Sequence, residues 1–266
     1  MNRRGPLNYP GSTVLITGAS SGLGAEFAAQ LAARGANLVL VARREDRLRE
    51  LAAALAARHS ITATAIGVDL AVPGAARVLA DALQDRGIAV DSLINNAGFG
   101  MVGDFAEADP DRLAELVAVN VAALTDLSRL LLPALLRSGR GMLLNIASTA
   151  SYQPTPGMAA YGASKAYVLS LTEAIGYEAR GSGLRVLAFS PGPTRTEFFD
   201  VVGGTEGAAV GRFQSAAQVV AAALAELDRT HRRPSVVSGR ANAATAILAR
   251  LAPRRFTLFA VARALR

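Results

Sequence analysis

Residues 13–24 read TVLITGASSGLG, and the interpretation of the whole chain starts from this stretch. The apolar run at residues 13–16 predicts a short buried strand. Gly18, Gly22 and Gly24 come next, and glycines let a backbone turn tightly and approach another group closely. The Ala-rich residues 26–34 then predict a helix. The chain is therefore expected to begin with a strand, a tight turn and a helix.

The alternation of strand and helix continues along the chain. Further strands are expected at residues 37–42, 61–68, 92–95, 141–147, 184–190 and 235–237. Further helices are expected at residues 45–58, 73–86, 110–136, 159–180 and 216–228. Repeated units of this kind predict an α/β fold, a doubly wound parallel sheet of the Rossmann type with helices on both faces. We expect one domain over residues 1–266, with a core at about 12–238 and a basic helical C-terminal extension at 239–266.

The composition excludes several kinds of site and signal. There are no cysteines and only two histidines, so we expect no metal site and no disulfide. The N-terminal residues 1–12 lack the apolar segment of an export signal. No run reaches the roughly 18 uninterrupted apolar residues that a membrane span needs. A cytoplasmic protein is the expectation.

The positive charge is concentrated at the C-terminal end. Residues 229–266 contain nine Arg and neither Asp nor Glu, so the rest of the chain carries 7 − 9 = −2 of the net charge of +7. The alternatives are a solvated tail, peripheral contact with an anionic membrane, an acidic partner and an acidic substrate. Nucleic acid is not expected as a partner, because no recognised nucleic-acid module accompanies the charge.

The glycine turn has the properties of a phosphate-binding loop. Its spacing is G-x-x-x-G-x-G, and the helix that follows offers free N–H groups and the positive end of its dipole to a pyrophosphate. A purely structural glycine turn is the alternative. The turn residues expected to hold a dinucleotide are Gly18, Ser20, Ser21, Gly22, Leu23 and Gly24.

The end of the second strand indicates which dinucleotide is preferred. A fold that prefers NAD usually places Asp or Glu there to hold the ribose 2′-hydroxyl, whereas this chain has Ala42 followed by Arg43 and Arg44. Guanidinium groups bind a 2′-phosphate, which a carboxylate would repel. We therefore expect NADP(H). The alternative is that the two arginines only solvate the start of a helix.

The chain contains one lysine among its 28 basic residues, and it lies in Tyr161-Gly162-Ala163-Ser164-Lys165. Residues four apart share a helix face, so Tyr161 and Lys165 are expected to converge. Unlike Arg, a Lys can change its protonation state. A nearby ammonium is expected to lower the pKa of Tyr161, which would make the phenol a general acid and base.

Further motifs follow in a fixed order, and the ordered set resembles the short-chain dehydrogenases/reductases over about residues 13–237. They are Asp69-Leu70, Asn95-Asn96-Ala97-Gly98, Asn120, Ser148 thirteen residues before Tyr161, and Pro191-Gly192 with Thr194 and Thr196. Position 21 is Ser, where some NADP-preferring members carry a basic residue, so the NADP(H) expectation depends mainly on Arg43. Thr194 stands where Val or Ile is commoner.

The resemblance implies a reaction and a role for each residue. The reaction is hydride transfer between the nicotinamide and a carbonyl or secondary alcohol, with Tyr161 as general acid or base. Ser148 would hold the substrate oxygen, Lys165 would bind the ribose, and Asn120 would hold a relay water. Asp69, Leu70, Asn96, Ala97, Gly98, Pro191, Gly192, Thr194 and Thr196 would contact the cofactor. The alternative is an NADP(H)-binding regulatory or membrane-docking protein with little activity.

The substrate itself is not determined by the sequence. Apolar residues in the segments expected around it suggest an apolar carbonyl or alcohol; they are Phe99, Met101, Phe105, Tyr152, Met158, Phe198 and Phe199. Residues 191–211, rich in Gly and Pro, are a candidate lid. By family analogy a homodimer or homotetramer is expected, built on the long helices that hold Asn120 and Tyr161.

Overall fold

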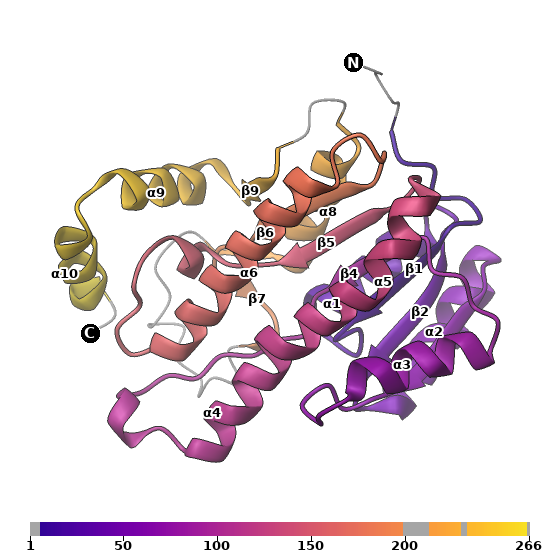
Figure 1. The fold of residues 1–266 in the computed structure, drawn as a ribbon, viewed down its shortest axis with the longest axis horizontal. Helices are drawn as coiled ribbons and strands as arrows, with labels where there is room; N and C mark the ends of the chain where they lie inside the picture. Colours follow the sequence, from indigo (N-terminus) through magenta and orange to yellow (C-terminus); the bar gives the residue numbers. More distant parts are fainter. Residues whose placement is uncertain (1–5, 199–212, 230–232, 265–266) are drawn as a thin grey trace.

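A computed structural model describes residues 6–198, 213–229 and 233–264. Within these residues, seven parallel strands form one sheet in the order β3-β2-β1-β4-β5-β6-β9 (Figure 1). The strands are β1 (Thr13–Thr17), β2 (Asn37–Ala42), β3 (Ala63–Gly67), β4 (Ser92–Asn95), β5 (Met142–Ile146), β6 (Arg185–Ser190) and β9 (Ser235–Val237). The expected doubly wound parallel sheet is confirmed.

Helices cover both faces of this sheet. The described helices are α1 (Gly22–Ala32), α2 (Glu45–His59), α3 (Ala75–Asp85), α4 (Pro110–Val117), α5 (Leu124–Ser138), α6 (Ala159–Glu178), α8 (Ala216–Leu227), α9 (Arg240–Leu251) and α10 (Arg254–Ala264). Apolar residues of α1, α2 and α8 pack on one face, and those of α3, α5 and α6 pack on the other. Side chains of β1 alternate between the two layers, since Val14 and Ile16 point into the first and Leu15 into the second.

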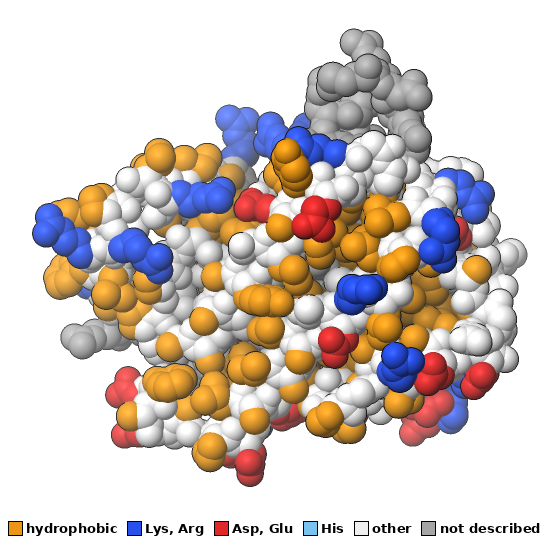
Figure 2. All heavy atoms as spheres, viewed as in Figure 1, with side chains coloured by type: hydrophobic (Ala, Val, Ile, Leu, Met, Phe, Trp, Pro, Cys, Tyr) orange, Lys and Arg blue, Asp and Glu red, His pale blue; other side chains and the backbone are white. Residues whose placement is uncertain are grey.

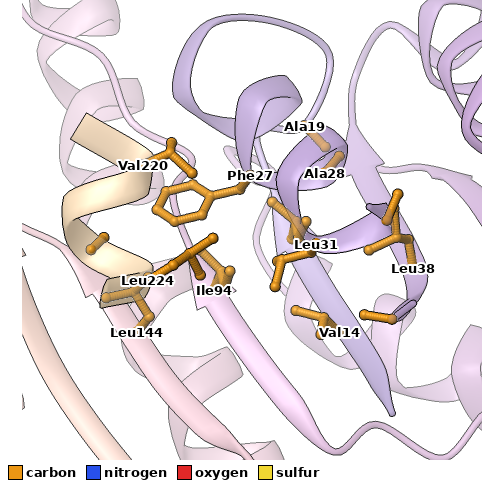
Figure 3. Close-up of a cluster of buried hydrophobic side chains, with 14 of the residues drawn as sticks. Val14, Ala19, Phe27, Ala28, Leu31, Leu38, Ile94, Leu144, Val220 and Leu224 are labelled. Carbon is orange, nitrogen blue, oxygen red and sulfur yellow. The ribbon is translucent and has the colours of Figure 1, made fainter. Parts of the chain in front are cut away.

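Phe27 of α1 lies at the centre of the first layer and is fully buried. In Figure 3 its ring lies among Val220 and Leu224 of α8 and Ile94 of β4. Burying a large aromatic side chain against both a helix and the sheet fixes the position of α1 on β1. The first turn of α1 is therefore held firmly beside the carboxyl end of that strand.

The helix expected at residues 110–136 is divided in the structure. Between α4 and α5 the chain forms one π-helical segment, Ala118–Ala123, which contains Asn120. Such segments are rare and frequently occur at functional sites. The periodicity of the sequence did not predict this π-helical segment. Asn120 in it forms hydrogen bonds with Phe99 and Ser164, which are distant in the sequence, and periodicity does not reveal such contacts. By length and composition this helical run could cross a membrane, but Leu127 and Leu135 belong to the core.

Smaller differences concern the ends of elements. α1 begins at Gly22 rather than at residue 26, so the end of the glycine turn is already the first helical turn. β3 is shorter than residues 61–68. Two strands of two residues each, β7 (Thr194–Arg195) and β8 (Gln214–Ser215), were not expected, because so short a strand has no periodicity to detect. The candidate lid lies largely outside the described residues.

The helical character expected for the C-terminal extension is confirmed. α9 contacts β9 and the 3₁₀ turn Thr149–Tyr152, and α10 follows after Pro253. Both helices lie beyond one end of the sheet, next to the segment that carries residues 148–158 (Figure 1). The extension is therefore packed against the part of the molecule where catalytic residues are expected.

Candidate active site

A cavity of about 480 Å³ lies at the carboxyl ends of the strands. Residues that directly follow β1 to β6 form its walls, which is the usual ligand position in open α/β sheets. The predicted residues that line it are Gly18, Ser20, Ser21, Gly22, Leu23, Arg43, Arg44, Asp69, Leu70, Asn96, Ala97, Gly98, Ser148, Tyr161, Lys165, Pro191, Gly192, Thr194 and Thr196. Two predicted residues, Gly24 and Asn120, stand behind the wall instead.

The glycine turn is shaped by close backbone contacts. Gly18 and Gly22 have φ values of +65° and +56°, which favour glycine. A Cβ at Gly24 would lie 2.1 Å from the carbonyl oxygen of Gly18. The Asn96 side chain fastens the turn from β4, donating to the carbonyl oxygens of Thr17 at 3.0 Å and Gly18 at 3.2 Å. The turn is thus held open toward the cavity.

The first turn of α1 retains binding capacity for an anion. Ser21 is the N-cap residue of this helix, and its side chain makes no capping hydrogen bond. The first N–H groups of a helix have no partners within the helix, and the dipole makes that end positive. Together with the glycine cradle, this geometry fits the pyrophosphate of a dinucleotide.

A group of cationic and hydroxyl side chains lies beside the same turn. Arg44 donates to the hydroxyls of Ser20 at 3.1 Å and Ser21 at 3.0 Å, and it forms an ion pair with Glu197 at 3.0 Å. Arg43 pairs with Glu115 at 3.0 Å. No carboxylate ends β2, where Ala42 stands. These groups suit a phosphate monoester better than a bare ribose hydroxyl.

Ser148, Tyr161 and Lys165 meet at the other end of the cavity. The Lys165 Nζ lies 5.9 Å from the centre of the Tyr161 ring and donates to the carbonyl oxygen of Ile146 at 2.9 Å. Ser148 is close enough to Tyr161 to lower the pKa of its phenol. Ser151 holds the 3₁₀ turn after Ser148 against α6, because its hydroxyl donates to the main-chain carbonyl of Lys165 at 2.8 Å. The three side chains were expected together, and the structure brings them together.

Burial dominates the electrostatics of this group. Desolvation raises the pKa of Tyr161 above its ordinary value, and Ser148 only partly opposes it. Desolvation also lowers the pKa of Lys165 to about 8. The expectation that Lys165 lowers the pKa of Tyr161 is therefore wrong for the protein alone. Burial is the largest cause of the raised pKa of Tyr161, although a lysine with a pKa of about 8 still holds its proton at neutral pH.

The Asn120 side chain makes three hydrogen bonds to protein groups. Its Oδ1 accepts from the Phe99 N–H at 3.1 Å, and its Nδ2 donates to the Phe99 carbonyl at 2.9 Å and to the Ser164 hydroxyl at 3.1 Å. A Cβ at Gly98 would approach Asn120 Oδ1 to 2.9 Å and Lys165 Nζ to 3.2 Å. Asn120 thus positions the loop beside Lys165, and its role in holding a relay water stays a prediction.

Only some of the apolar residues expected around the substrate line the cavity. Phe99, Met158 and Phe198 do, and the Phe198 ring centre lies 5.5 Å from that of Tyr161. Met101, Phe105 and Tyr152 do not line it. Phe105 is exposed, and the Tyr152 hydroxyl is within hydrogen-bond distance of the Ser190 hydroxyl, at 3.2 Å. Phe199 lies outside the described residues.

The sequence did not indicate that the C-terminal helices contribute to the cavity. Val261 of α10 lines it. A Cβ at Gly192 would lie 2.2 Å from the Nδ2 of Asn242, so α9 packs directly on the Pro191–Gly192 turn. Asn242 is buried. The one indication in the sequence was Asn242, a polar residue in an Ala-rich helix, but nothing in the sequence placed Asn242 near Gly192.

Comparisons with known proteins agree with this geometry. The family model described as short chain dehydrogenase matches residues 12–207. Sulfoacetaldehyde reductase 2 of Chromohalobacter salexigens is 36% identical over 219 residues, which cover 80% of this chain and 85% of that protein.

Two solved structures extend the comparison to the fold. A short-chain dehydrogenase from Sphingobium yanoikuyae in complex with NADPH has a TM-score of 0.79 and 34% identity, covering 95% of this chain and 93% of that one. The bulky-bulky ketone specific alcohol dehydrogenase from Comamonas testosteroni has a TM-score of 0.75 and 30% identity, covering 95% and 92%.

The lowered pKa of Lys165 determines how this residue makes the free energy of unfolding depend on pH. The pKa of Lys165 is about 8 in the folded protein, against 10.5 as its ordinary value, so unfolding takes up a proton between these pH values. The unfolded state then binds more protons, and the free energy of unfolding should rise by about 1.4 kcal/mol per pH unit from pH 8 to pH 10. Urea unfolding at several pH values measures this slope.

Lys165→Met is the control for this measurement, because it fills similar space without a titrating group. The variant should lack the rise and should be more stable than the wild type at pH 7. Equal slopes for the two proteins would mean that the pKa of Lys165 is not lowered.

Proposed function

The chain belongs to the short-chain dehydrogenase family, and we propose that it is an NADP(H)-dependent oxidoreductase acting on a carbonyl or secondary alcohol. Family membership makes it an oxidoreductase with a nicotinamide cofactor. One observation carries the finer proposal: a single cavity has a phosphate-binding turn with Arg43 and Arg44 at one end and the Ser148–Tyr161–Lys165 group at the other.

A nicotinamide cofactor held by the glycine turn with Arg43 and Arg44 would supply or accept the hydride. Tyr161 carries the proton part of the reaction at its Oη. Since its pKa is raised in the protein, the phenol is protonated near neutral pH and is ready to donate to a carbonyl oxygen. Ser148 holds that oxygen by a hydrogen bond and stabilises the negative charge that develops on it. The hydride and the proton together reduce the carbonyl to an alcohol.

Lys165 is placed to replace the proton that Tyr161 gives up. Its ammonium group contacts the ring of Tyr161, and burial brings its pKa to about 8, close to working pH. A group with such a pKa gains and loses a proton readily, which Arg does not. The positive charge that the cavity needs in order to stabilise a tyrosinate would come from the oxidised nicotinamide together with protonated Lys165.

Replacing the Tyr161 hydroxyl tests the reaction. Tyr161→Phe should lower kcat by about 10²- to 10⁴-fold, the usual contribution of a positioned general acid, while the Kd for NADPH stays within about two-fold. NADPH oxidation would be followed by absorbance with a panel of apolar ketones, aldehydes and 3-oxoacyl thioesters.

Two outcomes would count against the proposal. Undiminished turnover by Tyr161→Phe would remove Tyr161 from the mechanism. Tight NADPH binding by the wild type without turnover of any panel member would favour the alternative, a cofactor-binding regulatory protein.

Selectivity for NADP(H) over NAD(H) depends on the arginines beside the glycine turn. Arg44 is already oriented by Ser20 and Ser21, and Glu197 occupies part of its binding capacity. The 2′-phosphate of NADP(H) would bind Arg44 as a second anionic partner in addition to Glu197, with Arg43 beside it. NAD(H) carries no such phosphate and gains nothing from these side chains.

Removing both arginines should therefore change cofactor preference. Arg43→Ala/Arg44→Ala is expected to weaken NADPH binding by about 10- to 100-fold, because hydrogen bonds to a charged group are lost. NADH binding should be nearly unchanged. Titration calorimetry with both cofactors measures this, and Arg47→Ala, which removes a neighbouring arginine that also pairs with Glu197, is the matched control. An equal loss for NADPH and NADH would contradict the assignment.

The substrate is an apolar carbonyl compound or the corresponding alcohol. Phe99, Met158, Phe198 and Val261 supply apolar surface to the cavity, and the Phe198 ring centre lies 5.5 Å from that of Tyr161. Arg112 also lines the cavity, where Glu115 pairs with it at 2.5 Å and pairs with Arg43 as well.

The protein forms a homodimer or homotetramer across the outer face of α4, α5 and α6. Val117, Tyr167 and Tyr177 are exposed on these helices. Within residues 110–138, only 33% of the most apolar 18-residue stretch is buried. Figure 2 shows hydrophobic side chains spread across this face. Such a surface is typical of an interface between copies of one chain.

Charges introduced on that face should separate the subunits. Val117→Asp/Tyr167→Asp is expected to give the mass of one chain in light scattering, because a carboxylate cannot be buried unpaired in the interface. Val78→Asp, on the exposed side of α3, is the control and should leave the mass unchanged. A wild type with the mass of a single chain would contradict the oligomer.

A further inference from the structure

The C-terminal helices α9 and α10 have two different sides. On the inner side, Asn242 and Ala246 of α9 and Thr257 of α10 are buried, and Val261 lines the cavity. On the outer side, large apolar residues face solvent. The inner side thus belongs to the active site, and the outer side has no partner among the described residues of the chain.

The exposed apolar residues form a stripe rather than a scatter. Ile247, Leu248 and Leu251 lie at the i, i+1 and i+4 positions of α9, and their exposed fractions are 57%, 67% and 78%. On α10, Phe256 and Phe259 are three residues apart and so share one face of that helix, with 59% and 72% exposed. Contiguous exposed apolar residues of this size usually mark an interaction surface.

Arginines border the stripe. Within residues 233–264, the structure describes Arg233, Arg240, Arg250, Arg254, Arg255 and Arg263, and the sequence has no Asp or Glu there. Figure 2 shows hydrophobic and basic side chains together over α9 and α10, with no acidic side chain among them in that view. From the elements packed against these helices, Glu173 of α6 approaches Arg250 at 4.0 Å.

We propose that the outer side of α9 and α10 docks on the surface of an anionic lipid bilayer. Leu248, Leu251, Phe256 and Phe259 enter the region between headgroups and acyl chains, and the arginines bind lipid phosphates. Apolar residues flanked by Lys or Arg are the pattern of helices that lie in a membrane interface. The long arginine side chains reach the phosphates while their stems lie along apolar surface.

Two other occupants match the surface less well. An acidic protein would satisfy the arginines but would set its polar residues against Leu251 and Phe259. A second copy of this chain would place its own arginines opposite these, because a two-fold contact pairs a surface with itself. No carboxylate in residues 233–264 would neutralise them. An anionic bilayer supplies negative charge and an apolar interior at once.

Docking would also bring the substrate cavity to the membrane. α10 separates the two, since Val261 lines the cavity while Phe256 and Phe259 lie on the outer side. An apolar substrate dissolved in the bilayer would then lie one helix away from Tyr161. This relation to the substrate rests on the proposed function, whereas the docking itself does not.

Sedimentation with vesicles tests the docking with the full chain. Wild-type protein should bind vesicles of phosphatidylcholine mixed with phosphatidylglycerol, should bind pure phosphatidylcholine much more weakly, and should dissociate as salt is raised. Arg254→Gln/Arg255→Gln should weaken binding by about thirty-fold, because each basic residue near an anionic bilayer contributes roughly a factor of five. Arg58→Gln/Arg77→Gln removes the same charge from α2 and α3 and should bind like the wild type.

The chain has no Trp, so one introduced Trp reports insertion without interference. Phe259→Trp should shift its emission to shorter wavelength on anionic vesicles and should be quenched by brominated lipid. Val78→Trp, at an exposed position of α3, should show neither effect. Phe256→Ser/Phe259→Ser should weaken binding, while the unfolding temperature stays near that of the wild type because both side chains are exposed.

Several results would overturn the proposal. They are equal binding to neutral and anionic vesicles, equal weakening by the two arginine pairs, and an unchanged Trp spectrum. Absence of vesicle binding, with an oligomer that dissociates in Phe256→Ser/Phe259→Ser, would assign the surface to a second copy. None of these measurements needs turnover, so failure of the proposed reaction would be seen separately. Deleting residues 240–266 is unsuitable, since it removes Asn242 from Gly192 and Val261 from the cavity.

Discussion

The close approach of α1 to the end of β1 is the constraint on which the rest of this structure depends. No side chain fits at Gly24, because a Cβ there would lie 2.1 Å from the carbonyl oxygen of Gly18. Phe27, buried three residues later, fixes the helix against the sheet. The free N–H groups of the first helical turn therefore point into the cavity, at the place where the strand order reverses between β1 and β4. Asn96 locks this arrangement from the neighbouring strand.

At the other end of the cavity, burial rather than charge pairing determines the properties of the catalytic group. Burial lowers the pKa of Lys165, so its ammonium group loses a proton more readily. Burial also raises the pKa of Tyr161, so its phenol ionises less readily. Both shifts have the same cause, the cost of holding a charge away from water, and Lys165 with a pKa of about 8 still carries its proton at neutral pH. A neutral phenol beside a lysine of pKa about 8 suits proton donation to a carbonyl. The same two side chains need an additional positive charge before they can act as a base toward an alcohol.

The C-terminal extension is part of the site although it follows the family motifs in the sequence. Asn242 packs on Gly192, and Val261 is one of the residues that line the cavity. The short-chain dehydrogenase model ends at residue 207, so Asn242 and Val261 lie outside the region that the family model describes. Differences among relatives in substrate and in location are thus expected to arise in such segments, because they form walls of the cavity without altering the cofactor turn.

The sequence by itself determined the sheet, the cofactor turn and the Tyr161–Lys165 pair, because each depends on local spacing: strand and helix periods, glycines in one turn, and two residues four apart on a helix. It did not determine the π-helical segment at Asn120, the raised pKa of Tyr161, or the contacts of Asn242 and Val261. Those depend on hydrogen bonds and burial between segments far apart in the chain, such as Asn120 with Ser164 and Gly192 with Asn242. Residue spacing indicates which face of one helix or strand is buried but not which distant segments meet there, so only the tertiary structure decided these contacts.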